Sequence, residues 1–328
     1  MQRTLENNVP DVHTEAPNLK RPASAVRLSS GEERPVSRLT APAVPEMAIR
    51  TRSLRARLRF TASLWIGVVL LGIVVATALT APLIAPYPPE QLGVAVPLEP
   101  PSRLHPFGAD NLGRDLFSRV VFGARIALTM ALSGMAIGVS IGVTLGVLAG
   151  YYNRWIDRIL SRLMEVWLAF PALLLAILVV ARLGASLQST IVALGIVGAP
   201  AYFRLVRSGT LTAKHSLFVE AARATGASDI RILARHVLPS TASSIIVLAS
   251  MRSGLLLLAG AGLSFIGLGA QPPQPEWGAL LATGRTYLDA APWMAVFPGL
   301  AITLTVVGFN LFGDGLRDAL DPLRSNFG

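Results

Sequence analysis

The chain has 328 residues, of which 52% are hydrophobic and 15% are charged, and its formal net charge is +10. This charged fraction excludes an ordinary soluble domain, in which about a quarter of the residues are charged. The absence of cysteine excludes disulfides and thiolate chemistry, and four scattered histidines predict no metal or other cofactor. No basic stripe is interleaved with aromatic residues, so we expect no nucleic-acid partner.

The N-terminal part divides into a polar tail and a first apolar run. Residues 1–59 are rich in Pro, Ser, Arg and Glu without periodicity, which predicts a disordered cytoplasmic tail. The uncharged run 60–85 predicts a first transmembrane helix, with its span at Leu64–Ile84, because about 20 apolar residues cross a bilayer. Residues 86–124 are then an extracytoplasmic segment.

The extracytoplasmic segment carries a compact group of charges at Arg114, Asp115 and Arg119. Two interpretations are open for this group. The charges either stabilise an outer amphipathic helix through close pairs, or they form part of an outer vestibule or docking surface. Both interpretations place the group on the outer side of the membrane.

Further apolar runs lie within 125–313, which we interpret as the core domain. Because each is about as long as a bilayer is thick, the chain is expected to be an all-α, polytopic membrane helix bundle with six transmembrane helices. Residues 314–328 are expected to be a cytoplasmic C-terminal tail. The five further spans lie at 126–152, at about 163–181, between Arg182 and Arg204, at about 243–268, and between Asp289 and Asp314.

The orientation follows from the basic residues of the short loops. With the N-terminus inside, the loops on the inner side contain more Lys and Arg than the loops on the outer side. We therefore expect a multi-pass protein of the inner or plasma membrane, surrounded by the lipid bilayer, with both termini in the cytoplasm.

The second span has a glycine at every fourth position, so the glycines share one face of the helix. Such a face lets the backbone of another helix approach closely, which predicts a packing seam or a seam that also slides during gating. Pro171 and Pro298 lie inside other predicted spans and are expected to kink them. The glycines of this stripe are Gly134, Gly138, Gly142, Gly146 and Gly150.

Two charged residues fall inside predicted spans, where charge is costly. Arg252 lies about two turns from the cytoplasmic end of the fifth predicted span. It either snorkels or packs in a subunit interface, or it lines a path through the membrane. The same alternatives hold for Glu165, near the start of the third predicted span.

The connection 204–240, between the fourth and fifth spans, is longer than a simple loop needs to be. Ser216 is placed to cap a short helix through Phe218–Thr225, whose alanines give it a narrow surface. Gly226 is placed to end this helix, in a tight turn that a positive φ would suit.

A second amphipathic turn, Ile230–Val237, follows with its two arginines directed outward. Pro239 then closes the loop before the chain re-enters the membrane. Two short helices that meet at a glycine predict a compact element that projects from the bundle.

The residues of this connection resemble the EAA loop of binding-protein-dependent ABC importer permeases. In that family the loop is the coupling helix, which docks in a groove of the cytoplasmic ATPase, so the resemblance implies a type I ABC importer permease fold. A histidine two positions before Leu-Pro is similar to the peptide-transporter branch. The residues that carry the resemblance are Glu220, Ala221, Ala222, Gly226, His236, Leu238 and Pro239.

Two other segments agree with this branch. The run from His105 to Asp115 resembles the outer segment of dipeptide, oligopeptide and nickel permeases, and the run from Gly313 to Asp318 resembles the terminus of their C-type subunit. The resemblance implies a homologous B-type permease, two ATPase subunits and an extracytoplasmic binding protein as partners. It implies di- or oligopeptides as cargo, with nickel, glutathione or another small solute as alternatives.

Other classes of function explain the sequence less well. The chain has no P-loop motif, so ATP would be hydrolysed by the partner subunits, and this subunit is expected to be non-catalytic. A secondary transporter or channel without an ATPase predicts internal repeats, which we do not see, and leaves the Ala-Gly loop unexplained. A membrane-embedded hydrolase lacks a nucleophile and base constellation.

Overall fold

The computed structural model describes residues 62–152 and 154–320. Within these ranges the fold is all-α, as predicted: helices form the whole framework, and the β-structure is a single isolated bridge between Ala109 and Asp115. The predicted tail 1–59 and the last eight residues, 321–328, lie outside the described residues.

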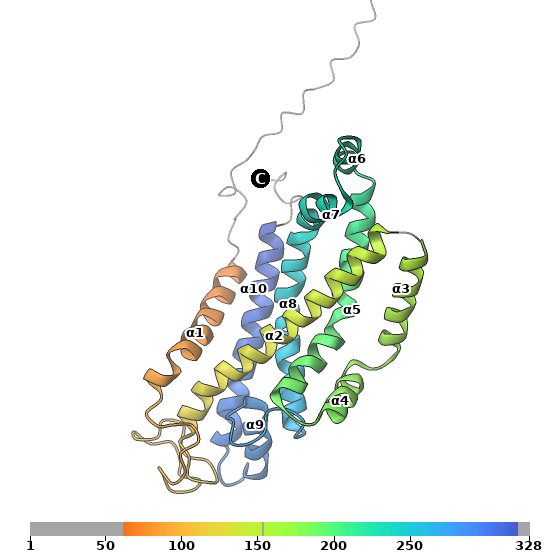
Figure 1. The fold of residues 1–328 in the computed structure, drawn as a ribbon. Helices are drawn as coiled ribbons and strands as arrows, with labels where there is room; N and C mark the ends of the chain where they lie inside the picture. The colour runs from red at the N-terminus through yellow and green to blue at the C-terminus, as the bar shows by residue number, and fades with distance from the viewer. Residues whose placement is uncertain (1–61, 153, 321–328) are drawn as a thin grey trace, which may run out of the picture. The chain divides into compact units, whose positions relative to one another are not determined.

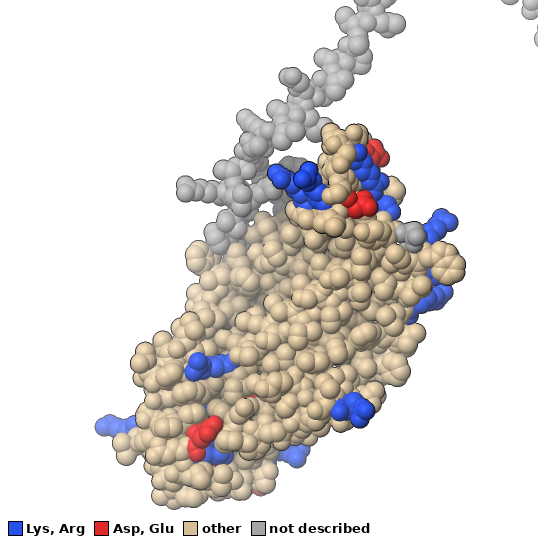
Figure 2. All heavy atoms as spheres, viewed as in Figure 1, with Lys and Arg blue, Asp and Glu red and all other residues tan. Residues whose placement is uncertain are grey.

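Five helices of the described part are long and apolar enough to cross a membrane. They stand side by side in the bundle of Figure 1, and side chains on the face drawn in Figure 2 form a broad uncharged zone below the charges around α6 and α7. Large apolar side chains such as Trp65, Ile73 and Leu83 are exposed, as lipid contact requires. The five helices are α1 (Ala62–Ile84), α2 (Leu116–Tyr151), α5 (Leu187–Lys214), α8 (Leu238–Phe265) and α10 (Trp293–Leu320).

The third predicted span is not a straight helix. It consists of α3 (Arg154–Ala169) and α4 (Ala172–Leu183), which meet at an angle of 94°. Pro171 separates them, because proline lacks an N–H and disfavours helical geometry in the residue before it. Asp157 of α3 accepts hydrogen bonds from Arg207 of α5 at 2.5 and 2.7 Å, which ties α3 to the bundle. The six-span prediction therefore holds only if the bent pair counts as one span.

Two other predicted boundaries also differ from the structure. α2 begins ten residues before the predicted start at residue 126, because Asp115 caps it by accepting the backbone N–H of Ser118. α10 continues to Leu320, so residues 314–320 of the expected cytoplasmic tail are helical. Pro298 lies inside α10 without ending it.

The glycine stripe of α2 packs against α5 along its whole length. A Cβ added at Gly142 would lie 2.5 Å from the Tyr202 Cβ and 2.6 Å from the Ala199 carbonyl oxygen. The Gly134, Gly138, Gly146 and Gly150 positions likewise face residues of α5. The stripe is therefore a packing seam that brings the two helix backbones together.

The bundle has two different ends (Figure 1). At one end the short helix α9 (Trp277–Thr286) packs between α8 and α10, and the Trp277 indole donates to the Val120 carbonyl of α2 at 2.8 Å. At the other end α6 (Leu217–Ala224) and α7 (Asp229–Ile232) project beyond the long helices. The connection 204–240 thus contains the end of α5, these two helices and the start of α8.

Candidate functional site

The projecting element is built from short helices around a small apolar core. α6 ends at Ala224, and Gly226 makes the turn toward α7 with φ +78°. This is the left-handed conformation that glycine adopts freely, and it agrees with the expected turn. Val219 of α6 and Ile232 of α7 are fully buried in the same apolar cluster, and this cluster fixes both helices to the bundle.

Two local predictions for this element are wrong. Ser216 occupies the N-cap position of α6, but its hydroxyl donates to the Ala213 carbonyl at 2.5 Å and does not cap the helix. Pro239 does not close the loop, because α7 continues through the π-helical segment η2 (Leu233–Val237) directly into α8. The wider π turn, in which the Leu238 N–H reaches the Leu233 carbonyl, accommodates a proline that has no N–H to donate.

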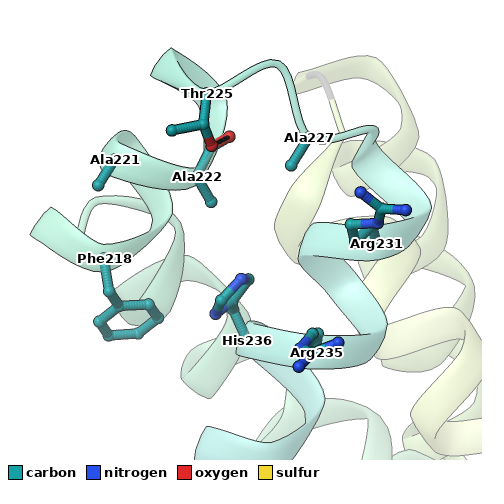
Figure 3. A pocket seen from close by; sticks show the side chains of 8 residues that line it. All are labelled: Phe218, Ala221, Ala222, Thr225, Ala227, Arg231, Arg235 and His236. Carbon is teal, nitrogen blue, oxygen red and sulfur yellow. Dashed lines mark hydrogen bonds between the residues drawn. The ribbon is translucent and has the colours of Figure 1, made fainter.

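A groove of about 670 Å³ runs between α6 and the α7–η2 segment (Figure 3). The α6 wall carries small and apolar side chains, and the α7–η2 wall carries cationic side chains. The centres of the Phe218 and His236 rings lie 6.2 Å apart. The predicted residues Ala221, Ala222 and His236 line it together, whereas Glu220 is exposed outside it. The lining residues are Phe218, Ala221, Ala222, Thr225, Ala227, Arg231, Arg235 and His236.

Tyr151, at the end of α2, links the projecting element to the membrane helices. Its hydroxyl donates to Asp229 of α7 at 2.5 Å, and Lys214 at the end of α5 donates to its carbonyl oxygen at 2.5 Å. The guanidinium of Arg223 in α6 lies 5.5 Å from the centre of the Tyr151 ring. Interaction with Tyr151 raises the pKa of Arg223 above its usual value, so this side chain stays charged.

Sequence reasoning did not select Tyr151 or Asp229. The two residues are 78 positions apart, and nothing in the local pattern of either one points to the other. The available signal was the aromatic pair Tyr151 and Tyr152 at the very end of the glycine-striped helix.

Arg252 lies further inside its helix than the sequence suggested. α8 already begins at Leu238, so Arg252 lies 14 residues inside a helix of 28 residues, or about 21 Å along its axis. Arg252 therefore lies at the midpoint of α8. Glu165, by contrast, is exposed on α3 and accepts from Arg162 at 2.8 Å.

The outer charged group forms a buried network at the start of α2. Arg114 pairs with Asp110 at 2.6 Å, and Arg119 donates to the Pro89 carbonyl at 2.8 Å. Asp115 accepts from the Ser118 hydroxyl at 2.7 Å and lies 2.9 Å from the His105 ring nitrogen Nδ1. Asp115 and Arg119 are buried, so they offer little surface to a docking protein and hold the outer segment on α2 instead.

Comparisons with known proteins agree with this architecture. Residues 142–326 match the family model of the binding-protein-dependent transport system inner membrane component. Over 222 residues the chain is 52% identical to the "Glutathione transport system permease protein GsiD" of Escherichia coli O1:K1 / APEC. It is 55% identical to the protein of the same name from Shigella flexneri serotype 5b (strain 8401). Each alignment covers 68% of this chain and 73% of the relative.

Two solved structures of inward facing conformations of the MetNI methionine ABC transporter share the fold, each with a TM-score of 0.51. Their sequences are 22% and 23% identical to this chain. The alignments cover 62% and 63% of this chain and 97% and 98% of the solved chains. The bundle with its projecting helices is thus the membrane-spanning permease subunit of an ABC importer, with the type I fold. The chain belongs to the family of binding-protein-dependent transport system inner membrane components.

Proposed function

We propose that this chain is a C-type permease that pairs with a homologous B-type permease to enclose one translocation path. Two ATPase subunits bind at the α6–α7 end, which is cytoplasmic together with both termini. An extracytoplasmic binding protein delivers cargo at the α9 end. Membership in a binding-protein-dependent importer family supports this set of partners.

The observation that carries the proposal is the short helix α6, which projects from the bundle and yet is fixed to it. Buried Val219 anchors α6, and the Tyr151 hydroxyl binds the neighbouring helix α7 through Asp229. When the ATPase subunits close on ATP, they displace α6 and α7 as a unit. The contacts of Tyr151 and Lys214 pass this movement to α2 and α5.

Within the loop, different residues have different tasks. The small surface of Ala221 lets α6 enter a groove of the ATPase, and the exposed carboxylate of Glu220 meets a cationic group there. Gly226 sets the turn that holds α6 and α7 at the groove between them. Leu238 and Pro239 start α8, so they connect the element to the membrane rather than contact the ATPase.

We propose short peptides as cargo, with glutathione the first to test. Glutathione is itself a tripeptide, and the named function of relatives 52% and 55% identical to this chain favours it. Other di- and oligopeptides share its backbone amides and free carboxylate. The proposed path follows α5 and α8, where Arg252 lies, and it leaves out Glu165, whose charge is paired with Arg162.

The test is uptake by the complete transporter in proteoliposomes. We expect ATP and the binding protein together to drive uptake of labelled glutathione or dialanine, and a non-hydrolysable ATP analogue to abolish it. The detergent-purified chain should bring the second permease and the ATPase subunits with it. Uptake without ATP by a solitary oligomer of this chain would instead identify a secondary transporter or channel.

A further inference from the structure

Arg252 is a cation in the middle of the membrane-crossing helix α8, and no ion pair among the described residues includes it. Within the described ranges, the ion pairs involve other residues, and the Nε of Arg252 is buried without a hydrogen-bond partner. A guanidinium at this depth is costly unless an anion or a set of acceptors meets it. The described residues 62–152 and 154–320 therefore leave this charge without an ionic partner.

The neighbour of Arg252 on α5 is also without a partner. α5 and α8 run antiparallel, since α8 meets α5 at Leu256 beside Gly198 and at Thr241 beside Gly209. Tyr202 lies between these two contacts along α5, at the level of Arg252 on α8.

Tyr202 is 0% exposed, and its hydroxyl forms no hydrogen bond. The site therefore combines a guanidinium fork with a hydroxyl, and neither group satisfies the other. Polar groups buried in this way carry a cost until an acceptor arrives, and a carboxylate offers two oxygens that fit the fork.

The site can be approached from one side of α8. Arg252 itself is partly exposed, and Leu255, one turn further along the helix, is largely exposed together with Leu258. On the remaining sides α8 packs on other helices: Ser253 donates to the Met135 sulfur of α2, and Gly254 lies against Phe309 of α10. A ligand can thus reach Arg252 along the uncovered face.

We propose that Arg252 binds a carboxylate of the cargo at the middle of the membrane, beside the Tyr202 hydroxyl. The ligand class is a short peptide with a free carboxylate, and this rests on the proposed function. Guanidinium suits this task because it stays charged and binds a carboxylate through two parallel N–H groups. A cargo whose carboxylates are blocked would lose this contact.

The test measures binding to the complete complex in detergent without the binding protein, so that delivery does not enter the result. Saturation-transfer NMR reports weak binding of glutathione and of its diethyl ester, in which both carboxylates are blocked. We expect wild type to bind glutathione at least about tenfold more tightly than the ester, as the loss of one charge-assisted pair implies. Arg252→Gln should remove this preference, and Arg182→Gln, which changes an exposed arginine at the end of α4, should keep it.

Two results would overturn the proposal. One is equal binding of glutathione and the ester by wild type, and the other is an unchanged preference in Arg252→Gln. If wild type shows no preference and Arg252→Gln also loses the second permease, Arg252 pairs with a carboxylate of that subunit instead. ATP-driven uptake by wild type tests the proposed function separately, so its failure is distinguishable from each of these.

Discussion

Tyr151 is the residue through which the projecting helices meet the membrane helices. Tyr151→Phe removes the hydroxyl that donates to Asp229 and leaves the ring with its cation contacts. We expect a loss of stability of about 1 kcal/mol, typical of one hydrogen bond, and a larger fall in cargo-stimulated ATP hydrolysis. Melting temperature and ATPase rate are measured on the same complex.

The control for this change is Tyr152→Phe, because Tyr152 is its neighbour and is exposed. This variant should match wild type in both measurements. If Tyr151→Phe keeps full stimulation while it loses stability, the hydroxyl has only a structural role.

Glu276 predicts a pH effect on stability. It caps α9, which is not one of the membrane-crossing helices, by accepting the Ala279 N–H at 2.9 Å, and burial raises its pKa. As the pH rises from about 4, the Glu276 carboxyl ionises first in the unfolded chain. Wild type therefore loses stability until this carboxyl ionises in the folded protein as well. Glu276→Gln keeps an acceptor oxygen without the charge.

The melting temperature of Glu276→Gln relative to wild type should therefore increase between about pH 4 and pH 8. Thermal unfolding of the detergent-purified complex over this range measures the difference. A difference independent of pH would show that ionisation of Glu276 is not linked to folding.

At the scale of helices, the seam between α2 and α5 predicts unequal costs for equal substitutions. Gly142→Ala places a methyl group 2.5 Å from the Tyr202 Cβ and 2.6 Å from a backbone oxygen, so the helices must separate. At Gly134 the nearest atom is 3.3 Å away, and alanine needs only a small adjustment. We expect Gly142→Ala to cost about 1–3 kcal/mol, the range of overpacked sites, and Gly134→Ala clearly less. Thermal unfolding and the yield of assembled complex measure both, and equal costs would count against the seam.

The long helices follow from the sequence because uncharged runs of bilayer length leave few alternatives. The third span was predicted less well, since α3 combines apolar residues with Asp157, whose partner Arg207 lies 50 positions away. The start of α8 was misplaced for a different reason. Pro239 reads as a helix boundary, but the π turn before it lets the helix continue.

The candidate site was found in part. Ala221, Ala222 and His236 could be selected because their spacing is local, and the structure brings them to one groove. Tyr151 was not selected, because its partner Asp229 is 78 positions away in the sequence. Arg252 was recognised as unusual, but its position within the helix depends on where α8 begins, which the sequence did not reveal.

For the whole molecule, the arrangement predicts that the α6–α7 end and the outer segment lie on opposite sides of the membrane. The chain contains no cysteine, so single cysteines at Ser102 and Ser228 can be labelled without background. Both positions are exposed. We expect a membrane-impermeant maleimide to label Ser102→Cys from outside in intact cells and Ser228→Cys only after the membrane is opened. Labelling of both from one side would exclude the proposed topology.

The central claim is that α6 and its turn transmit ATPase closure to the membrane helices. Valine at Gly226, where φ is +78°, strains the turn because a β-branched residue resists this conformation. Glu220→Lys reverses the charge offered to the ATPase. Gly184→Val is the matched control, since Gly184 has φ +90° at the end of α4, and neither glycine has a neighbour within 4 Å of an added Cβ.

The most direct measurement is ATP hydrolysis by the reconstituted complex with and without the cargo-loaded binding protein. We predict that Gly226→Val and Glu220→Lys reach the membrane but lose at least about tenfold of the stimulation, the effect of about 1.4 kcal/mol. Gly184→Val should keep the stimulation. Wild-type stimulation in both loop variants would contradict the account, because the element would then be no more than a surface connection between α5 and α8.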